Sequence, residues 1–278
     1  MVNSHIQLPK GISKHFCNPD QKNNQTVYYL SFKTGEIKCA APKKLGIERG
    51  RYPDVLEQEL SRLVEGPIAK LNAEILKFAN GESDSIKISQ DDVKTAKTYI
   101  KASLTRSDMA LDIIREKTGL SLEEAKEIQR TVIMSGLLNT GAIDDYLSDY
   151  KFTVLINKST CQFVVPRSCF YYVESCGKKT IVAPISPIAA LLLIPNTYPI
   201  DLVEQNNLLY AKIESTDDVL ELNQRAVKME YLYNGETGFV ASAYKEVLEP
   251  LKLHLKYNRN GFNREKEEFL KFSIGGKL

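Results

Sequence analysis

The sequence predicts an α+β fold, in which an N-terminal hairpin and a helical middle precede a mostly antiparallel sheet with C-terminal helices. Three observations support this class. Helical periodicity dominates residues 54–138, strand-like patterning dominates residues 151–194, and the two patterns are segregated along the chain. Alternating strands and helices would indicate a doubly wound parallel sheet, whereas segregated ones are typical of α+β proteins.

The N-terminal part is expected to be irregular and then to form strands. Pro9 and Gly11 disfavour a long helix at the start of the chain. Residues 27–32 are rich in Tyr and β-branched residues, and Gly35 separates them from residues 36–40, which predicts a β-hairpin. Because two strands are too few to be stable alone, we expect the hairpin to join or cover the later sheet.

Three helical segments are expected in the middle of the chain, and the first has an apolar stripe at helical spacing. In the second and third, a Ser is followed three residues later by an acid, which predicts capping boxes. The expected ranges are 54–80 with an interruption at Gly66-Pro67, 89–117 with a break near Ser107, and 121–138, followed by a short helix over 143–148.

After Tyr150 the pattern changes to short strands separated by turn residues. The expected strands are 151–157, 163–165, 170–173, 180–183, 189–194 and 208–213. Two more helices are expected, over 217–231 and 242–256. We predict a single domain over residues 1–257 and a polar, flexible tail over residues 258–278.

Composition limits the classes of function. The chain has 37 Lys plus Arg and 35 Asp plus Glu. Its net charge therefore gives no overall attraction to nucleic acid or to an anionic membrane, although a local basic patch would be compatible with this composition. The longest apolar run, residues 188–194, is much shorter than the roughly 20 residues of a membrane helix. Five cysteines without C-x-x-C spacing and a polar start predict free thiols and a cytoplasmic location. Phosphate-loop, zinc-protease and nucleophile-elbow motifs do not occur.

Three residues near the N-terminus and on the first long helix could carry chemistry. His5 could be a general base or a metal ligand, or could bond the backbone while the N-terminal arm packs on the core. Glu57 and Glu65 lie eight residues apart, about 80° around an ideal helix. Such carboxylates could bind a divalent cation or serve as acid and base, or could form the solvated face of the helix.

Further candidates lie on later segments. Arg106 could bind a phosphate or carboxylate, or could pair with a helix acid such as Asp108 or a glutamate of the first long helix. Asn223 is unfavourable inside a helix and is expected to make a specific bond, to a ligand or to the backbone. Ser168 and Cys169 have no histidine nearby in sequence, so a nucleophile there is only weakly indicated, and the cysteines of this half are expected to fill the core.

The order of these segments resembles the prokaryotic domain-of-unknown-function family 4238. The similarity extends over roughly residues 3–245 and is carried by the opening residues 5–16, the hairpin 27–40, Glu57 and Glu65, Arg106, the turn 163–169, the segment 184–194 and Asn223. This chain has Arg167 where the family has an acidic turn residue, and its His5 stands one residue further from Pro9 than is typical.

The resemblance implies a cytoplasmic bacterial protein from a family without an established activity, associated with mobile elements or phage defence. Two hypotheses follow. In the first, the protein is a hydrolase that cleaves nucleic acid, and carboxylates would hold a divalent metal. Its candidate catalytic residues are His5, Glu57, Glu65, Arg106 and Asn223. In the second, it is a non-catalytic binding or regulatory protein in which these polar residues form a structural network. The near-neutral charge and Arg167 favour the second hypothesis.

Overall fold

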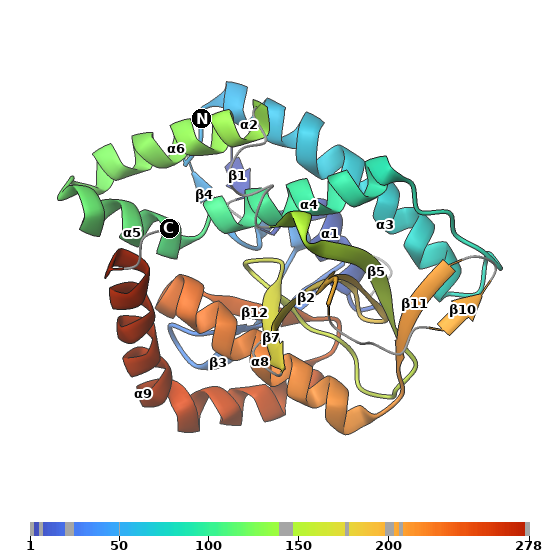
Figure 1. Ribbon diagram of the computed structural model, residues 1–278. Coiled ribbons are helices and arrows are strands. Elements are labelled where there is room, and N and C mark those ends of the chain that lie inside the picture. Colours follow the sequence, from blue (N-terminus) through green and yellow to red (C-terminus); the bar gives the residue numbers. More distant parts are fainter. Residues whose placement is uncertain are drawn as a thin grey trace.

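The computed structural model describes residues 3–5, 8–19, 25–49, 51–138, 147–175, 178–197, 203–205 and 208–275. It confirms the α+β class: helices lie above and below a central sheet in Figure 1. Among the described residues, the helices are all too short or too polar to cross a membrane.

The N-terminal part forms two small sheet elements. β2 (Val27–Ser31) and β3 (Glu36–Ala40) form the expected antiparallel hairpin, with Gly35 at φ +67° in the turn. β1 (Asn3–His5) pairs with β4 (Ile47–Arg49), which the sequence did not indicate. Between these strands lie α1 and two short 3₁₀ turns, with bounds Lys10–Ser13, Lys14–Phe16 and Pro42–Lys44.

The first long helical segment continues through the predicted interruption. α2 (Asp54–Leu60) leads through a π-turn (Ser61–Glu65) into α3 (Gly66–Ala79), and the N–H of Gly66 donates to the carbonyl of Ser61, five residues back. Pro67 has no N–H for an α-helical bond, and the wider turn accommodates it. The expected kink or break is therefore a π-turn with one extra residue, which rotates α3 by about 100° relative to α2.

The next three helices follow the predicted breaks and caps. They are α4 (Gln90–Thr105), α5 (Asp108–Thr118) and α6 (Leu122–Leu138). Ser89 and Ser121 form the expected capping boxes, and Ser107 caps α5 by accepting the N–H of Ala110. Most of the short helix expected over 143–148 lies outside the described residues.

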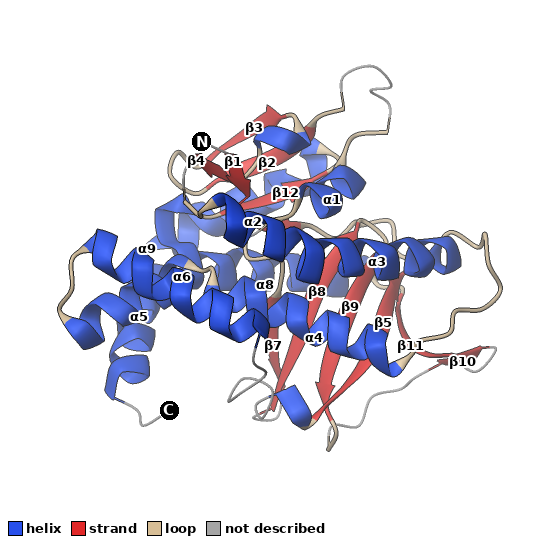
Figure 2. Cartoon of the chain, turned by 90° about the horizontal axis from the view of Figure 1, so that it is seen from above, coloured by secondary structure: helices blue, strands red, loops and turns tan. Residues whose placement is uncertain are grey.

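The larger sheet has six strands in the order β10-β11-β5-β9-β8-β7, antiparallel except for the parallel pair β11 and β5. Their bounds are Val203–Gln205, Leu208–Ile213, Tyr150–Asn157, Ala189–Pro195, Lys178–Ser186 and Tyr171–Ser175. In β9, Leu191 and Leu193 pack into one core cluster and Leu192 into another. Its continuous apolar run reflects burial on both faces, with α3 and α4 lying across one of them in Figure 2.

The smaller sheet has the order β3-β2-β12-β6, so the N-terminal hairpin joins a sheet, as expected. β6 (Val165–Pro166) and β12 (Phe239–Ser242) are its C-terminal strands. α8 (Thr216–Asn234), a 3₁₀ turn (Gly235–Thr237) and α9 (Lys245–Gly275) complete the chain.

The C-terminal segment is helical through Gly275, where the sequence predicted a flexible tail over 258–278. α9 continues to Gly275, Phe262 is only 4% exposed, and the hydroxyl of Tyr231 on α8 donates to Asn263. Many polar and charged residues separate the apolar ones in this segment, so its sequence signal was weak, but α9 packs against α5 and α8.

Candidate functional site

The chain passes from the smaller to the larger sheet in a tight turn, Pro166-Arg167-Ser168-Cys169. The N–H of Cys169 donates to the carbonyl of Pro166 at 2.9 Å. Cys169 has φ +69° and is the non-glycine residue in the described part of the chain with a left-handed backbone. Backbone strain of this kind is concentrated at functional sites. In this turn, Arg167 lines a pocket, whereas Cys169 is buried in the core.

Arg167 reaches a pocket of about 650 Å³, a size common for small-molecule sites. The pocket lies where β4, α5, α6, the end of α8, β12 and α9 meet. Five basic side chains line it: Lys44, Arg51, Lys126, Arg167 and Lys266. Three acidic side chains line it: Glu48, Asp108 and Asp112. Cations therefore outnumber carboxylates in the lining, which favours an anionic occupant.

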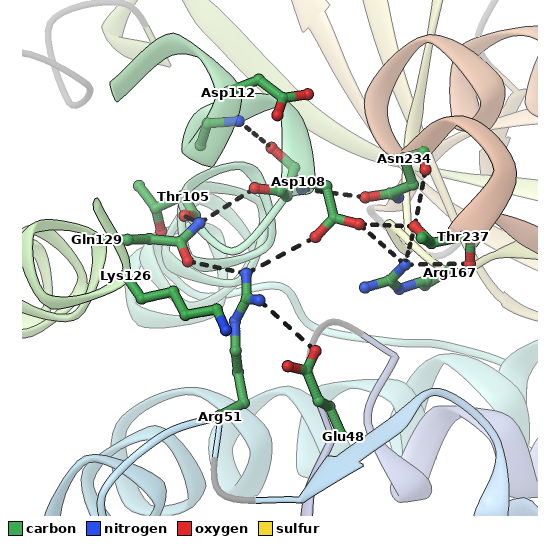
Figure 3. Close-up of polar contacts among 12 residues, drawn as sticks. Glu48, Arg51, Thr105, Asp108, Asp112, Lys126, Gln129, Arg167, Asn234 and Thr237 are labelled. Carbon is green, nitrogen blue, oxygen red and sulfur yellow. Dashed lines mark hydrogen bonds and ion pairs between the residues drawn. The ribbon is translucent and has the colours of Figure 1, made fainter. Parts of the chain in front are cut away.

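Asp108 lies between two arginines in this pocket (Figure 3). Its Oδ1 is 3.7 Å from Nη2 of Arg51, and its Oδ2 is 3.3 Å from Nη1 of Arg167. Oδ2 also accepts the hydroxyl of Thr237 at 2.6 Å. Asp108 is the first residue of α5, where a negative charge complements the helix dipole. Both arginines are 5% exposed, so their charges are largely removed from water.

Gln129 of α6 positions Arg51. Its Oε1 accepts a guanidinium N–H of Arg51 at 3.1 Å, while its Nε2 donates to the carbonyls of Thr105 and Ser107. The amide of Gln129 thereby ties α6 to the junction of α4 and α5, and it fixes the direction of Arg51 (Figure 3). Glu48 adds a longer contact to Arg51, at 3.5 Å.

Glu230 of α8 lies under the pocket and is completely buried. Its Oε2 accepts the N–H of Ser168 at 2.9 Å, and its Oε1 accepts Nδ2 of Asn234 at 2.8 Å. Asn234 in turn accepts the N–H of Asp108 with its Oδ1 at 3.2 Å. Burial raises the pKa of Glu230 to about 7, although the guanidinium of Arg167 and these hydrogen bonds oppose the rise.

Three of the sequence-predicted residues gather next to this pocket. Nη1 of the fully buried Arg106 lies 3.9 Å from Oε1 of Glu65. Burial raises the pKa of Tyr52, which Glu57 raises further and Arg106 opposes. Burial likewise raises the pKa of Tyr99, on which Arg106 and Glu65 also act.

The π-turn brings the two glutamates toward the same side of the helical segment. Eight residues of ideal α-helix would leave Glu57 and Glu65 about 80° apart, and the extra residue reduces this to roughly 20°. Glu57 acts on the buried Tyr52, and Glu65 acts on the buried Tyr99 and lies near Arg106, so the two carboxylates are not simply a solvated helix face.

The other two predicted residues lie elsewhere. Asn223 is fully buried, accepts the N–H of Val164 at 3.0 Å and donates to the carbonyl of Gln162 at 2.8 Å. Its specific bonds are thus made to the backbone that leads into β6, not to the group around Arg106. The backbone of His5 pairs with Ile47, but its side chain lies outside the described residues.

Metal binding stays a prediction. Within the part of the chain that the structure describes, three or more His, Cys, Asp or Glu side chains do not come together in a group that could hold a metal ion. Of the helix acids predicted as partners of Arg106, Glu65 lies beside it, whereas Asp108 contacts Arg51 and Arg167.

The sequence analysis missed Arg51, Gln129, Glu230 and Asn234. A signal was present for Glu230, which follows Val219, Asn223 and Val227 at spacings of three or four and so shares the buried face of its helix. A carboxylate on such a face needs polar partners, which points to a polar site. For Arg51 and Gln129, the contact depends on how the segment before α2 packs against the distant helix α6.

Comparison with known proteins adds no relative: neither a protein-family model, nor a curated protein, nor a solved structure matches the chain.

Proposed function

We propose that the protein binds a small molecule with an anionic group in the pocket between Arg51 and Arg167, which corresponds to the binding alternative of the two hypotheses. The observation that carries this proposal is the pair of buried guanidiniums that share one carboxylate, Asp108.

The contacts of this carboxylate leave room for a second anion. Charge-assisted N–H···O bonds are typically about 2.7–2.9 Å long. The distances from Asp108 to Arg167 and Arg51 are 3.3 and 3.7 Å. Buried charges are stable only with close compensation. A ligand phosphate or sulfate at the two guanidiniums would supply the shorter, stronger contacts that Asp108 does not provide.

The apolar side chains in the lining of the pocket favour a ligand with an apolar body. They are Ile47, Leu111, Leu122 and Phe239. Binding pockets combine apolar walls with a few convergent polar groups that fix the orientation of the ligand. We therefore infer that the ligand joins an anionic group to a flat or apolar moiety, as phenyl phosphate does.

The group around Arg106 supports the same proposal. Arg106 is fully buried, bonds the carbonyl of Ala102 through its Nε, and lies beside Glu65 and Tyr99. Such an enclosed arrangement suits the structural network of the binding hypothesis and would hold α3 against α4 next to the pocket.

Isothermal titration calorimetry with phenyl phosphate and inorganic phosphate tests the proposal. Arg167→Lys keeps the charge but loses the planar fork of donors, so we expect it to weaken phenyl phosphate binding by about tenfold or more. Arg225→Lys, at an exposed arginine of α8, is the matched control and should bind like the wild type. Equal binding by both variants, or no binding of either probe to the wild type, would contradict the proposal.

A further inference from the structure

We propose that anion binding in this pocket is coupled to protonation of Glu230 through a flip of the Asn234 side-chain amide. The ligand part of this inference rests on the proposed function, whereas the proton-driven flip depends only on the hydrogen bonds below the pocket.

Three hydrogen-bonding groups form a continuous relay from Glu230 to the N-terminus of α5. Glu230 Oε1 accepts from Asn234 Nδ2 at 2.8 Å, and Asn234 Oδ1 accepts the N–H of Asp108 at 3.2 Å. Asn234 is 2% exposed, so water does not readily replace either bond. An amide has one acceptor end and one donor end, so this chain of bonds has a fixed direction.

A proton from solvent on Oε1 of Glu230 reverses that direction. The new O–H is a donor and faces Nδ2 of Asn234, which is also a donor. Rotation of the amide by about half a turn presents Oδ1 to the O–H and Nδ2 to Asp108. The N–H of Asp108 then loses its acceptor, while the bond from the Ser168 N–H to Oε2 is kept.

Both consequences favour an anionic ligand. Loss of the carboxylate charge removes a negative group that acts on Arg167. Loss of the Asn234 bond frees the first residue of α5, so that Asp108 can move away from the arginines. We therefore expect binding to be tighter at low pH, and ligand binding to take up a proton.

The surroundings make Glu230 the group that titrates near neutrality. Burial raises its pKa to about 7, whereas burial raises the pKa of the neighbouring Cys169 thiol to about 12. Arg167 acts on Glu230 directly, and Asp108 is joined to it through Asn234. Arg106 and Glu65 act on the same Cys169 thiol as Glu230, and Lys266 of α9 lies beside Gly235.

Gly238 keeps room for this carboxyl group. A Cβ at Gly238 would lie 2.9 Å from Oε1 of Glu230 and 2.9 Å from a ring carbon of Phe32. Only a residue without a side chain allows the buried carboxyl group and the 3₁₀ turn to be neighbours.

Amide NMR of the ¹⁵N-labelled full chain tests the relay without a ligand. Between about pH 5.5 and pH 8.5, the amides of Ser168 and Asp108 and the side-chain amide of Asn234 should titrate together, with a midpoint near the pKa of Glu230. The amide of Asp218, which donates to the uncharged Ser215 hydroxyl, should stay constant as the control. A constant Asp108 or Ser168 resonance would overturn the inference.

Two variants separate the relay from a direct effect of charge. Asn234→Ala removes the amide, so Ser168 should still titrate and Asp108 should not; titration of Asp108 in this variant would overturn the relay. Glu230→Gln should abolish the titration at all three groups, because Gln can accept from Ser168 and donate to the flipped amide at any pH. If Asn234→Ala does not fold, comparison of the amide titrations of the wild type and Glu230→Gln still tests the relay.

Binding of phenyl sulfate, whose charge is constant over this range, tests the coupling. We expect affinity at about pH 5.5 to exceed that at about pH 8.5 by about fivefold or more. Glu230→Gln should keep the tighter affinity at both values, while Glu221→Gln, exposed on the same helix, should behave like the wild type. Equal wild-type affinities would overturn the coupling. If phenyl sulfate binds at neither pH, the proposed function fails, and the NMR titration still decides the relay.

Discussion

Arg167 Nη1 lies 3.3 Å from Asp108 Oδ2, although the two residues are 59 positions apart in sequence. The strained turn before Cys169 places the guanidinium, and the N-terminus of α5 places the carboxylate. This pair joins the sheet half of the molecule to its helical half. Its energetic and functional roles can be separated by substitution.

Asp108→Asn should weaken the fold and strengthen anion binding. The substitution leaves two buried guanidiniums without their shared carboxylate and removes a charge that complements the α5 dipole. We expect the free energy of unfolding to fall by about 1–3 kcal/mol in thermal or urea unfolding. Phenyl sulfate, which no longer competes with a carboxylate, should bind more tightly.

Asp217→Asn is the control for this experiment, since Asp217 also stands in the first turn of a helix but is exposed. It should change the free energy of unfolding and the affinity for phenyl sulfate only slightly. Unaltered stability of Asp108→Asn would show that the carboxylate does not compensate the arginines.

Gln129→Leu should destabilise the protein and weaken anion binding together. The substitution preserves approximate size but leaves Arg51 and two carbonyl groups without their hydrogen-bonding partner. Such losses cost about 1–3 kcal/mol for each buried polar group left unsatisfied. Gln58→Leu, at an exposed position of α2, gives the baseline in the same unfolding and calorimetry experiments. Weaker binding without a stability change would mean that Gln129 contacts the ligand itself.

Glu230→Gln should change how stability depends on pH. The folded pKa of Glu230 is raised from 4.5 to about 7, so its stabilising contribution is complete below about pH 4.5 and is lost as pH rises through 7. The stability of Glu230→Gln relative to wild type should therefore increase with pH over this window, by at most about 3 kcal/mol. Urea unfolding at several pH values measures this difference, and a constant difference would show that Glu230 is ionised throughout.

Glu65→Ala should affect stability without affecting any cleavage activity. Removing this partner leaves the charge of Arg106 buried with less compensation, and we expect a loss of about 1–2 kcal/mol. Glu59→Ala, which removes the partner of the exposed Arg62, should cost less. Incubation of the wild type with DNA or RNA and Mg²⁺ or Mn²⁺ tests the nuclease hypothesis. Cleavage that Glu65→Ala abolishes at unchanged stability would support that hypothesis over the binding one.

Local patterns predicted most elements of this fold. The Ser caps, the hairpin and the apolar strand at 189–194 depend on neighbouring residues, and each was confirmed. The π-turn at Ser61–Glu65 replaced a predicted break because the sequence does not show how a helix adapts to Pro67. The helical tail was missed because Phe262 of α9 packs on Tyr231 of α8, which is distant in sequence.

The candidate site was only partly predictable. Glu57, Glu65 and Arg106 do lie around one buried group, but the pocket is built by Arg51 and Asp108, which the sequence analysis did not join. These residues come from separate segments, so no spacing rule connects them. The sequence did indicate single polar residues among apolar ones, and such residues become buried when the helices pack.

The central claim is that Arg51 and Arg167 hold the anionic group of a ligand. A crystal structure of the protein soaked with phenyl sulfate tests it most directly. We predict the sulfate between the two guanidiniums, with the ring against Phe239 and Leu111 and with Asp108 moved away from Arg167. Sulfate bound elsewhere, or a pocket left unoccupied with both arginines still on Asp108, would contradict the account.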